Sequence, residues 1–320
     1  MGRRERRRQL RGAKSTPVTE QVNVSKPARA NVFKNVYENN YKKLLLIPFI
    51  ILLLSIGVIV FQVATTGDFV SKGISLKGGI VATISTSDIT PQELQSFMTT
   101  QFPGSEINVR VVEELGVQQA LIVESGDVKS TDLTAALNSF QAGLSDQASI
   151  EEIGASLSNS FFRQTILAVI IAFIFMSIVV FLHFKTFAPS AAVILAAASD
   201  IIITLAVFNL LGMKLSTAGV AAFLMLIGYS VDTDILLSTR VLKSQEGKVI
   251  TRVYDAMRTG MTMTLTTIAA VIVGLLVSQS DVLHQIMTIL LIGLLADIVN
   301  TWIQNAGILR WYMEKKNGQS

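Results

Sequence analysis

The sequence predicts an α-helical polytopic membrane protein with six transmembrane helices and a small extracytoplasmic α+β domain between helices 1 and 2. Three observations lead to this fold class. Half of the 320 residues are hydrophobic, only 16% are charged, and the mean hydropathy is +0.52, as is typical of chains that live largely in a membrane. Six apolar runs are long enough to cross a hydrocarbon layer of about 30 Å. Between the first two lies a polar stretch of the size of a small domain.

Composition also limits the chemistry. The chain has no cysteine, which excludes disulfides, thiolate metal sites and thiol nucleophiles. Its two histidines, His183 and His284, fall in expected loops, so a histidine-built metal centre is not expected. We therefore expect no metal site, no cofactor and no catalytic residue.

Residues 1–43 are expected to form a basic cytoplasmic arm that is largely disordered. The arm holds twelve basic and three acidic residues, with prolines and little apolar periodicity. We interpret it as an orientation signal that also attracts anionic membrane lipid. An alternative is contact with ribosomal RNA through the cluster RRERRR, but no aromatic side chains for base stacking lie nearby. A specific nucleic-acid partner is therefore not expected.

The six apolar runs define the membrane topology. Residues 44–63 are expected to form helix 1, and residues 163–311 helices 2 to 6, followed by a cytoplasmic tail at 312–320. The later runs cover roughly 164–182, 188–210, 216–238, 261–278 and 284–307. Lysine and arginine are concentrated on the side that holds both ends of the chain, so we expect a cell-membrane protein with both termini cytoplasmic.

The segment 64–162 is expected to be the extracytoplasmic domain. Thr90, Pro91 and Glu93 form a helix-start pattern for a helix reaching about residue 102. The stretches 107–113 and 118–124 resemble a hairpin, and a second helix is expected from about 130 to 144. With strands near 80–85 and 149–153, the order is β-α-β-β-α-β, which predicts a ferredoxin-like unit. Its acidic residues are scattered over polar faces, which indicates solvated surface rather than a catalytic site.

Acidic residues interrupt three of the apolar runs. Asp200 lies in the third, Asp232 and Asp234 lie in the fourth within GYSVDTDILLSTR, and Asp297 with Asn300 lies in the sixth. A charge at the centre of a membrane helix costs roughly 2.5–3.5 kcal/mol on insertion scales, so each such acid is a functional hypothesis. A purely structural role remains the alternative for each of them.

Helix geometry separates the two neighbouring acids. Successive residues turn by about 100°, so Asp232 and Asp234 point about 200° apart and do not serve one face. Asp234 lies nearer the cytoplasmic end, where water can solvate it. Close packing at Gly228 and at a row with Thr262 and Thr266 would bring Asp200 near Asp232 or Arg240. The residues expected to pack helices are Thr262, Thr266 and Thr267.

Next to helix 1, residues 73–79 read GISLKGG, with glycines at Gly73, Gly78 and Gly79. This run resembles the glycine element of the SecD/SecF family of protein-export membrane proteins, in its SecF branch, with Ser75 where an acid is usual. Before helix 2, Gly154 matches a second element, with Ala155 where proline is expected.

The intramembrane motifs extend this resemblance. Asp200 matches the family's aspartate in the third helix, and Gly228, Tyr229, Ser230 and Arg240 match the signature of the fourth. There are also departures: Asp232 stands at an asparagine position, Thr233 at an aspartate, Asp234 at a small hydroxyl residue, and Thr239 at an aspartate. These departures and the very basic arm favour an archaeal form.

The resemblance implies a function. A member of this family would be a subunit, not an enzyme, that assists Sec-dependent protein translocation. Its partners would be a SecD-like subunit, the Sec translocation channel, unfolded exported polypeptide and membrane lipid. Proton flow through Asp200, Asp232, Asp234 and Arg240 would be coupled to movement of the outer domain, with Asp297 and Asn300 as further relay members or partner contacts.

Two other classes of function are weighed against this one. Six helices are also half of an RND-type transporter that exports small molecules, which would likewise require a second half. An intramembrane aspartyl protease also uses two aspartates on different helices. Its Gly-x-Gly-Asp and Tyr-Asp signatures are absent here, because Asp200 follows Ala-Ser and Asp232 follows Ser-Val.

Overall fold

The structure is a computed structural model that describes residues 37–38, 40–86, 88–114, 117–243, 248–278, 280–316 and 318. Tyr41–Ser320 forms one compact unit, which holds the bundle and the α+β domain. Most of the basic arm lies outside the described residues, so its role stays a prediction.

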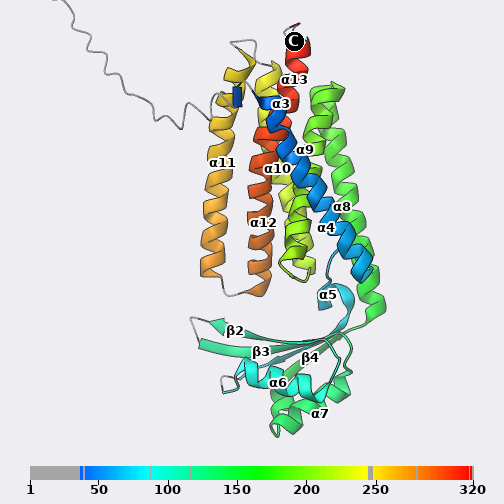
Figure 1. Cartoon of the computed structure of the whole chain (residues 1–320). Helices are drawn as coiled ribbons and strands as arrows, with labels where there is room; N and C mark the ends of the chain where they lie inside the picture. Colours follow the sequence, from blue (N-terminus) through cyan, green and yellow to red (C-terminus); the bar gives the residue numbers. More distant parts are fainter. Residues whose placement is uncertain are drawn as a thin grey trace, which may run out of the picture. The chain divides into compact units, whose positions relative to one another are not determined.

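Within the described residues, six helical spans are long and apolar enough to cross a membrane, which confirms the predicted fold class. Figure 1 shows them as a bundle with the α+β domain at one end, here called the proximal end. The bundle consists of α3 Tyr41–Leu44, α4 Leu46–Thr66, α8 Ala155–Phe184, α9 Phe187–Leu210, α10 Thr217–Lys243, α11 Val249–Val277, α12 Asp281–Val299, the π-helical turn η2 Asn300–Asn305 and α13 Ala306–Lys316.

Three helices differ from the apolar runs that predicted them. The run starting at 261 is the later part of α11, which begins at Val249. The run starting at 164 is the later part of a longer helix, because α8 begins at Ala155. The last run is interrupted by η2, whose residues Asn300, Thr301, Gln304 and Asn305 are all buried. A π turn widens a helix locally and often marks a functional site. It depends on side-chain partners from other helices, so hydropathy could not reveal it.

The α+β domain has the predicted order of elements: β1 Gly79–Ile84, α6 Pro91–Gln101, β2 Ile107–Glu114, β3 Val117–Ser125, α7 Ser130–Phe140, a short 3-10 turn and β4 Ala148–Ile153. The sheet order is β2-β3-β1-β4 with antiparallel neighbours, as in a ferredoxin-like split βαβ unit. Helices α6 and α7 cover one face of the sheet around buried Ile84, Leu121 and Leu137. The expected helix start is confirmed, since Thr90 Oγ1 accepts a hydrogen bond from the Glu93 amide at 3.4 Å.

The glycine element connects this domain to the bundle. The Gly73 amide donates to the Leu215 carbonyl at 2.8 Å, in the loop between α9 and α10, and the Leu215 amide donates to the Ser71 carbonyl at 2.7 Å. After the one-turn helix α5, Ile74–Lys77, the chain turns at Gly78 and Gly79 with φ values of 87° and 140°. A Cβ on Gly79 would lie 2.3 Å from the Ser125 carbonyl oxygen, so only glycine fits where β1 begins.

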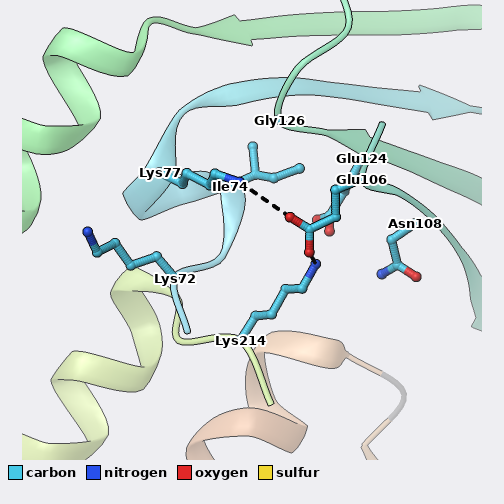
Figure 2. Close-up of a pocket in the computed structure, with 8 residues that line it drawn as sticks. All are labelled: Lys72, Ile74, Lys77, Glu106, Asn108, Glu124, Gly126 and Lys214. Carbon is cyan, nitrogen blue, oxygen red and sulfur yellow. Dashed lines mark hydrogen bonds and ion pairs between the residues drawn. The ribbon is translucent and has the colours of Figure 1, made fainter. Parts of the chain in front are cut away.

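An ion-pair cluster reinforces the same junction. Glu106, in the loop between α6 and β2, pairs with Lys77 of α5 at 3.3 Å and with Lys214 of the α9–α10 loop. Figure 2 shows Glu106 between the two lysines, which reach it from opposite sides. The hydrogen bond from Lys214 is the main cause that lowers the pKa of Glu106 below its usual value, against a smaller opposing effect of burial.

We expect Glu106→Gln to loosen the contact between the α+β domain and the α9–α10 loop. Exposed ion pairs contribute only roughly 0.2–1 kcal/mol each, so the bundle should remain folded. Because the folded-state pKa of Glu106 is lowered, its ionised carboxylate stabilises the folded contact at pH values above the ordinary glutamate pKa. This stabilisation is lost as the pH falls through the lowered value. Protection of the Gly73 and Leu215 amides, measured as exchange relative to the intrinsic rate at each pH, should therefore fall in the wild type on acidification and be low at all pH values in Glu106→Gln. A wild-type exchange rate that matches the variant at neutral pH would contradict this.

Candidate functional site: a buried carboxyl cluster

Three carboxyl groups are buried in the interior of the helix bundle. Asp200 of α9 and Asp234 of α10 are 0% exposed, and Asp297 of α12 is 1% exposed. Small residues along α9, among them Ala196, Ala197 and Ser199, let the neighbouring helices approach closely. Burying three acids together is costly, which indicates a function beyond packing.

Asp200 joins three helices. Ser230 of α10 donates its hydroxyl to Asp200 Oδ2, and Asn300 Nδ2 of η2 donates to Oδ1 at 2.7 Å. Ser230 belongs to the Gly-Tyr-Ser motif, so the motif serine directly contacts the motif aspartate. Both carboxyl oxygens are thereby held by donors from different helices.

The other two acids share one hydroxyl. Thr301 Oγ1 lies 3.0 Å from Asp234 Oδ1 and 2.9 Å from Asp297 Oδ1, and Asn305 Nδ2 donates to Asp234 Oδ1 at 2.7 Å. A threonine hydroxyl has a single hydrogen and can donate to only one acceptor. Its second contact is a hydrogen bond only when that carboxyl carries a proton and donates it to Thr301. The geometry thus fits a pair of acids that hold one proton between them.

The cluster has acceptor capacity left. Among the described residues, no hydrogen bond reaches the buried atoms Asp234 Oδ2, Asp297 Oδ2, Asn300 Oδ1, Gln304 Oε1 and Asn305 Oδ1. The described part of the chain also brings no three carboxylates or histidines together closely enough to hold a metal ion. The carboxyls are connected through hydroxyl and amide groups instead, an arrangement suited to holding and passing protons.

The structure separates the four residues predicted to form a relay. Asp234 is buried, whereas Asp232 is exposed on the opposite side of α10, as the helical geometry required. The expectation that water solvates Asp234 is wrong, because α12 and η2 cover it. The expectation that Asp200 lies near Asp232 or Arg240 is also wrong, because Asp200 meets Ser230 and Asn300 instead. Arg240 is exposed and makes no hydrogen bond or ion pair with other described residues.

The packing side of α11 also differs from the prediction. Thr262 and Thr266 are exposed, Thr267 is half-buried, and all three hydroxyls donate to carbonyls of their own helix. The buried side carries Gly260 and Thr264. The buried face of α11 differs from the predicted one because Trp302 of η2 packs against Gly260. A Cβ added at position 260 would lie 2.4 Å from the Trp302 ring.

The remaining motif residues lie at helix ends or on open faces. Gly154 precedes α8 in an extended conformation, and a Cβ added to Gly154 or to Gly228 would meet no neighbour within 4 Å among the described residues. Tyr229 is 45% exposed. The sequence reasoning missed Thr301 and Asn305. The polar run NTWIQN inside an apolar helix was the signal that could have revealed them.

Comparison with known proteins identifies the family of the chain. Residues 133–315 match the family described as protein export membrane protein SecD/SecF, C-terminal. The protein-export membrane protein SecF of Pyrococcus furiosus is 37% identical over 89% of this chain and 96% of its own length. That of Methanocaldococcus jannaschii is 41% identical over 86% of this chain and 96% of its own length.

A solved structure supports the fold. The crystal structure of SecDF from Thermus thermophilus, a translocon-associated membrane protein, superposes with a TM-score of 0.68 at 19% identity. The match covers 87% of this chain but only 38% of that longer chain. Together with the matches in sequence, this shows that the chain belongs to the SecD/SecF family of protein export membrane proteins.

Proposed function

We propose that this chain is the SecF-type subunit of a complex that assists Sec-dependent protein translocation across the cell membrane, and that its buried carboxyl cluster couples proton flow to movement of the α+β domain. The observation that carries the proposal is the single hydroxyl of Thr301 between Asp234 and Asp297. Its partners would be a SecD-like subunit, the Sec channel, exported polypeptide and membrane lipid.

The hydroxyl gives a physical reason for coupling. When the carboxyl that donates to Thr301 loses its proton, one of the two hydrogen bonds at this hydroxyl is lost, so the attraction between α10 and α12 changes. The proximal ends of the same two helices are tied together, because Gln285 of α12 accepts from the Ser216 amide at 3.1 Å and donates to the Lys214 carbonyl at 2.6 Å. That loop bonds to Gly73 at the junction with the α+β domain. A change between α10 and α12 therefore has a connected route to the domain.

The orientation also belongs to this proposal. The basic residues at the chain ends and in the α10–α11 loop favour a cytoplasmic location for the end of the bundle opposite the α+β domain. The proximal end would then face the outside, and protons would enter the cluster from there.

Proton movement tests the proposal directly. The complex with its SecD-like subunit and the Sec channel is reconstituted in vesicles that enclose a pH-sensitive dye, and an acid-outside gradient is applied during translocation. We expect Asp234→Asn to abolish the acidification that accompanies translocation, since an amide carries no titratable proton. Asp255→Asn, an exposed aspartate of α11, serves as the matched control and should behave as wild type. Undiminished proton entry in Asp234→Asn would overturn the coupling.

An exposed face of α10 is the surface we assign to the SecD-like subunit. Met225, Gly228, Tyr229 and Asp232 are all exposed there, although they lie within a span apolar enough to cross a membrane. Leaving Asp232 in contact with lipid would cost roughly 2.5–3.5 kcal/mol, and a glycine allows close helix approach. A polar helix face of a second subunit would offset that cost.

Site-specific photo-crosslinking can locate this face, because a photoreactive side chain reacts in an apolar environment. In the complex, a photoreactive amino acid at position 229 should form an adduct with the SecD-like subunit. The same amino acid at position 60, where Val60 is exposed on α4, should give several-fold less. Equal adducts at the two positions would place the interface elsewhere.

A further inference from the structure

A groove separates the α+β domain from the bundle. Its volume is about 760 Å³, within the range of sites that bind ligands. In Figure 1, α6 and α7 lie beyond the sheet, so the opposite face of the sheet is turned toward the proximal ends of α10 and α12. The groove thus has a sheet on one side and helix ends on the other.

The sheet side of the groove is a mixed surface. Val81 of β1 pairs with Glu124 of β3, and Glu124 pairs with Asn108 of β2, which makes one row across three strands on the uncovered face. Ile107 and Ile153 border this row. Apolar side chains therefore alternate with groups that form hydrogen bonds.

The bundle side of the groove also combines apolar side chains with groups that form hydrogen bonds. The α9–α10 loop contributes Met213, and the first turns of α10 and α12 contribute Ala218 and Val282 as apolar contacts. Between them lie the polar groups of Ser216 and Gln285. Both walls can contact apolar side chains and peptide amides together.

The charges that line the groove are paired within the chain. Arg110 bonds to Glu124, and Lys214 bonds to Glu106. A phosphate or a strongly acidic partner would have to break these pairs in order to bind. Glu106 is shared by Lys214 and Lys77. The exposed Glu151 of β4 lies opposite Val81 on the same face of the sheet. Charges of both signs therefore surround the groove and offset one another, which is complementary to a ligand without net charge.

We propose that this groove binds an uncharged, extended segment of the exported polypeptide as it emerges beside the membrane. The inference rests on the proposed export function and adds the place and the chemistry of contact. Apolar side chains of the segment would lie against Val81, Ile153 and Met213. Its backbone groups would bond to Asn108 and to the second hydrogen of Gln285 Nε2, the first being donated to the Lys214 carbonyl. The Glu106 ion pairs hold the α+β domain over the loop and so preserve the groove.

Site-specific photo-crosslinking tests this contact in the complete complex with its SecD-like subunit and the Sec channel. An unfolded exported protein is arrested in transit by a folded domain fused to its end. A photoreactive amino acid at position 81 should give an adduct with the arrested chain. At position 135, where Ala135 is exposed on α7 behind the sheet, it should give several-fold less. Equal adducts, no adduct, or adducts with lipid alone would overturn the proposal.

A second variant examines the charge argument. Val81→Glu places an unpaired carboxylate in the groove and should reduce the adduct formed from a probe at position 153 several-fold. Val81→Thr, which keeps the shape without the charge, should retain it, and an equal loss in both variants would speak against the groove as a neutral site. The two proposals can fail separately. Loss of export in Asp200→Asn without any adduct at position 81 would leave the proposed function standing and remove the groove.

Discussion

Asp200→Asn is expected to lower export to the level of cells that lack the subunit while the protein remains folded in its complex. The amide matches the carboxyl in shape and can still accept a hydrogen bond from Ser230, while the Asn300 side chain can turn to present its oxygen. What the variant loses is the ability to bind and release a proton. The measurement is the rate at which a secreted reporter appears outside cells whose only copy of the subunit is the variant.

Two variants make this result interpretable. Asp255→Asn removes an exposed carboxyl from α11 and should export normally. Asp200→Glu restores a titratable group in an imperfect position and should recover part of the rate, which a purely structural role would not predict. Normal export by Asp200→Asn would refute the assignment of Asp200 to the proton path.

Gly260→Leu should destabilise the bundle more than any other single glycine substitution on α11. A Cβ at position 260 would lie 2.4 Å and 2.7 Å from ring atoms of Trp302 and 3.2 Å from Thr233 Cγ2. Overpacking of this kind costs typically about 1–3 kcal/mol. Because Trp302 is in η2, the displaced ring would also disturb Thr301, so proton coupling should fail together with stability.

Thermal unfolding of the purified complex in detergent measures the effect. Gly57→Leu is the control, because no atom of the described residues lies within 4 Å of a Cβ built on Gly57 of α4. The melting temperature of Gly260→Leu should fall by several degrees, while that of Gly57→Leu should stay near the wild type. Equal melting temperatures would show that α11 shifts away from Trp302 without cost.

The parts of the fold that local sequence controls could be predicted. Hydropathy alone located the six spans, and the N-cap at Thr90 with the following proline located a helix of the α+β domain. Motif spacing identified Asp200 and Ser230 as important, although not that they touch. Each of these features depends on neighbours within a few residues or on a continuous apolar run.

The arrangement of the site depended on contacts far apart in the chain. Which of Asp232 and Asp234 is buried is decided by where α12 lies, and nothing within α10 shows it. The packing face of α11 is likewise fixed by Trp302, more than thirty residues away in sequence. The role of Thr301 and Asn305 could not be predicted from sequence, because it depends on the π turn that places both residues beside Asp234.

The π turn has a consequence for insertions and deletions. A π turn accommodates about one residue more than the α-helical turn it replaces, so a residue removed from Asn300–Asn305 would let the span close into a continuous α-helix with little rotation of the later positions. The contacts made inside the turn, among them that of Thr301 with Asp234, would be displaced, while Leu309 would stay buried in the interior. A single codon deletion here would therefore remove the geometry of the site and leave the C-terminal helix in place, whereas the same deletion in a regular part of the span would rotate every later position by about 100°.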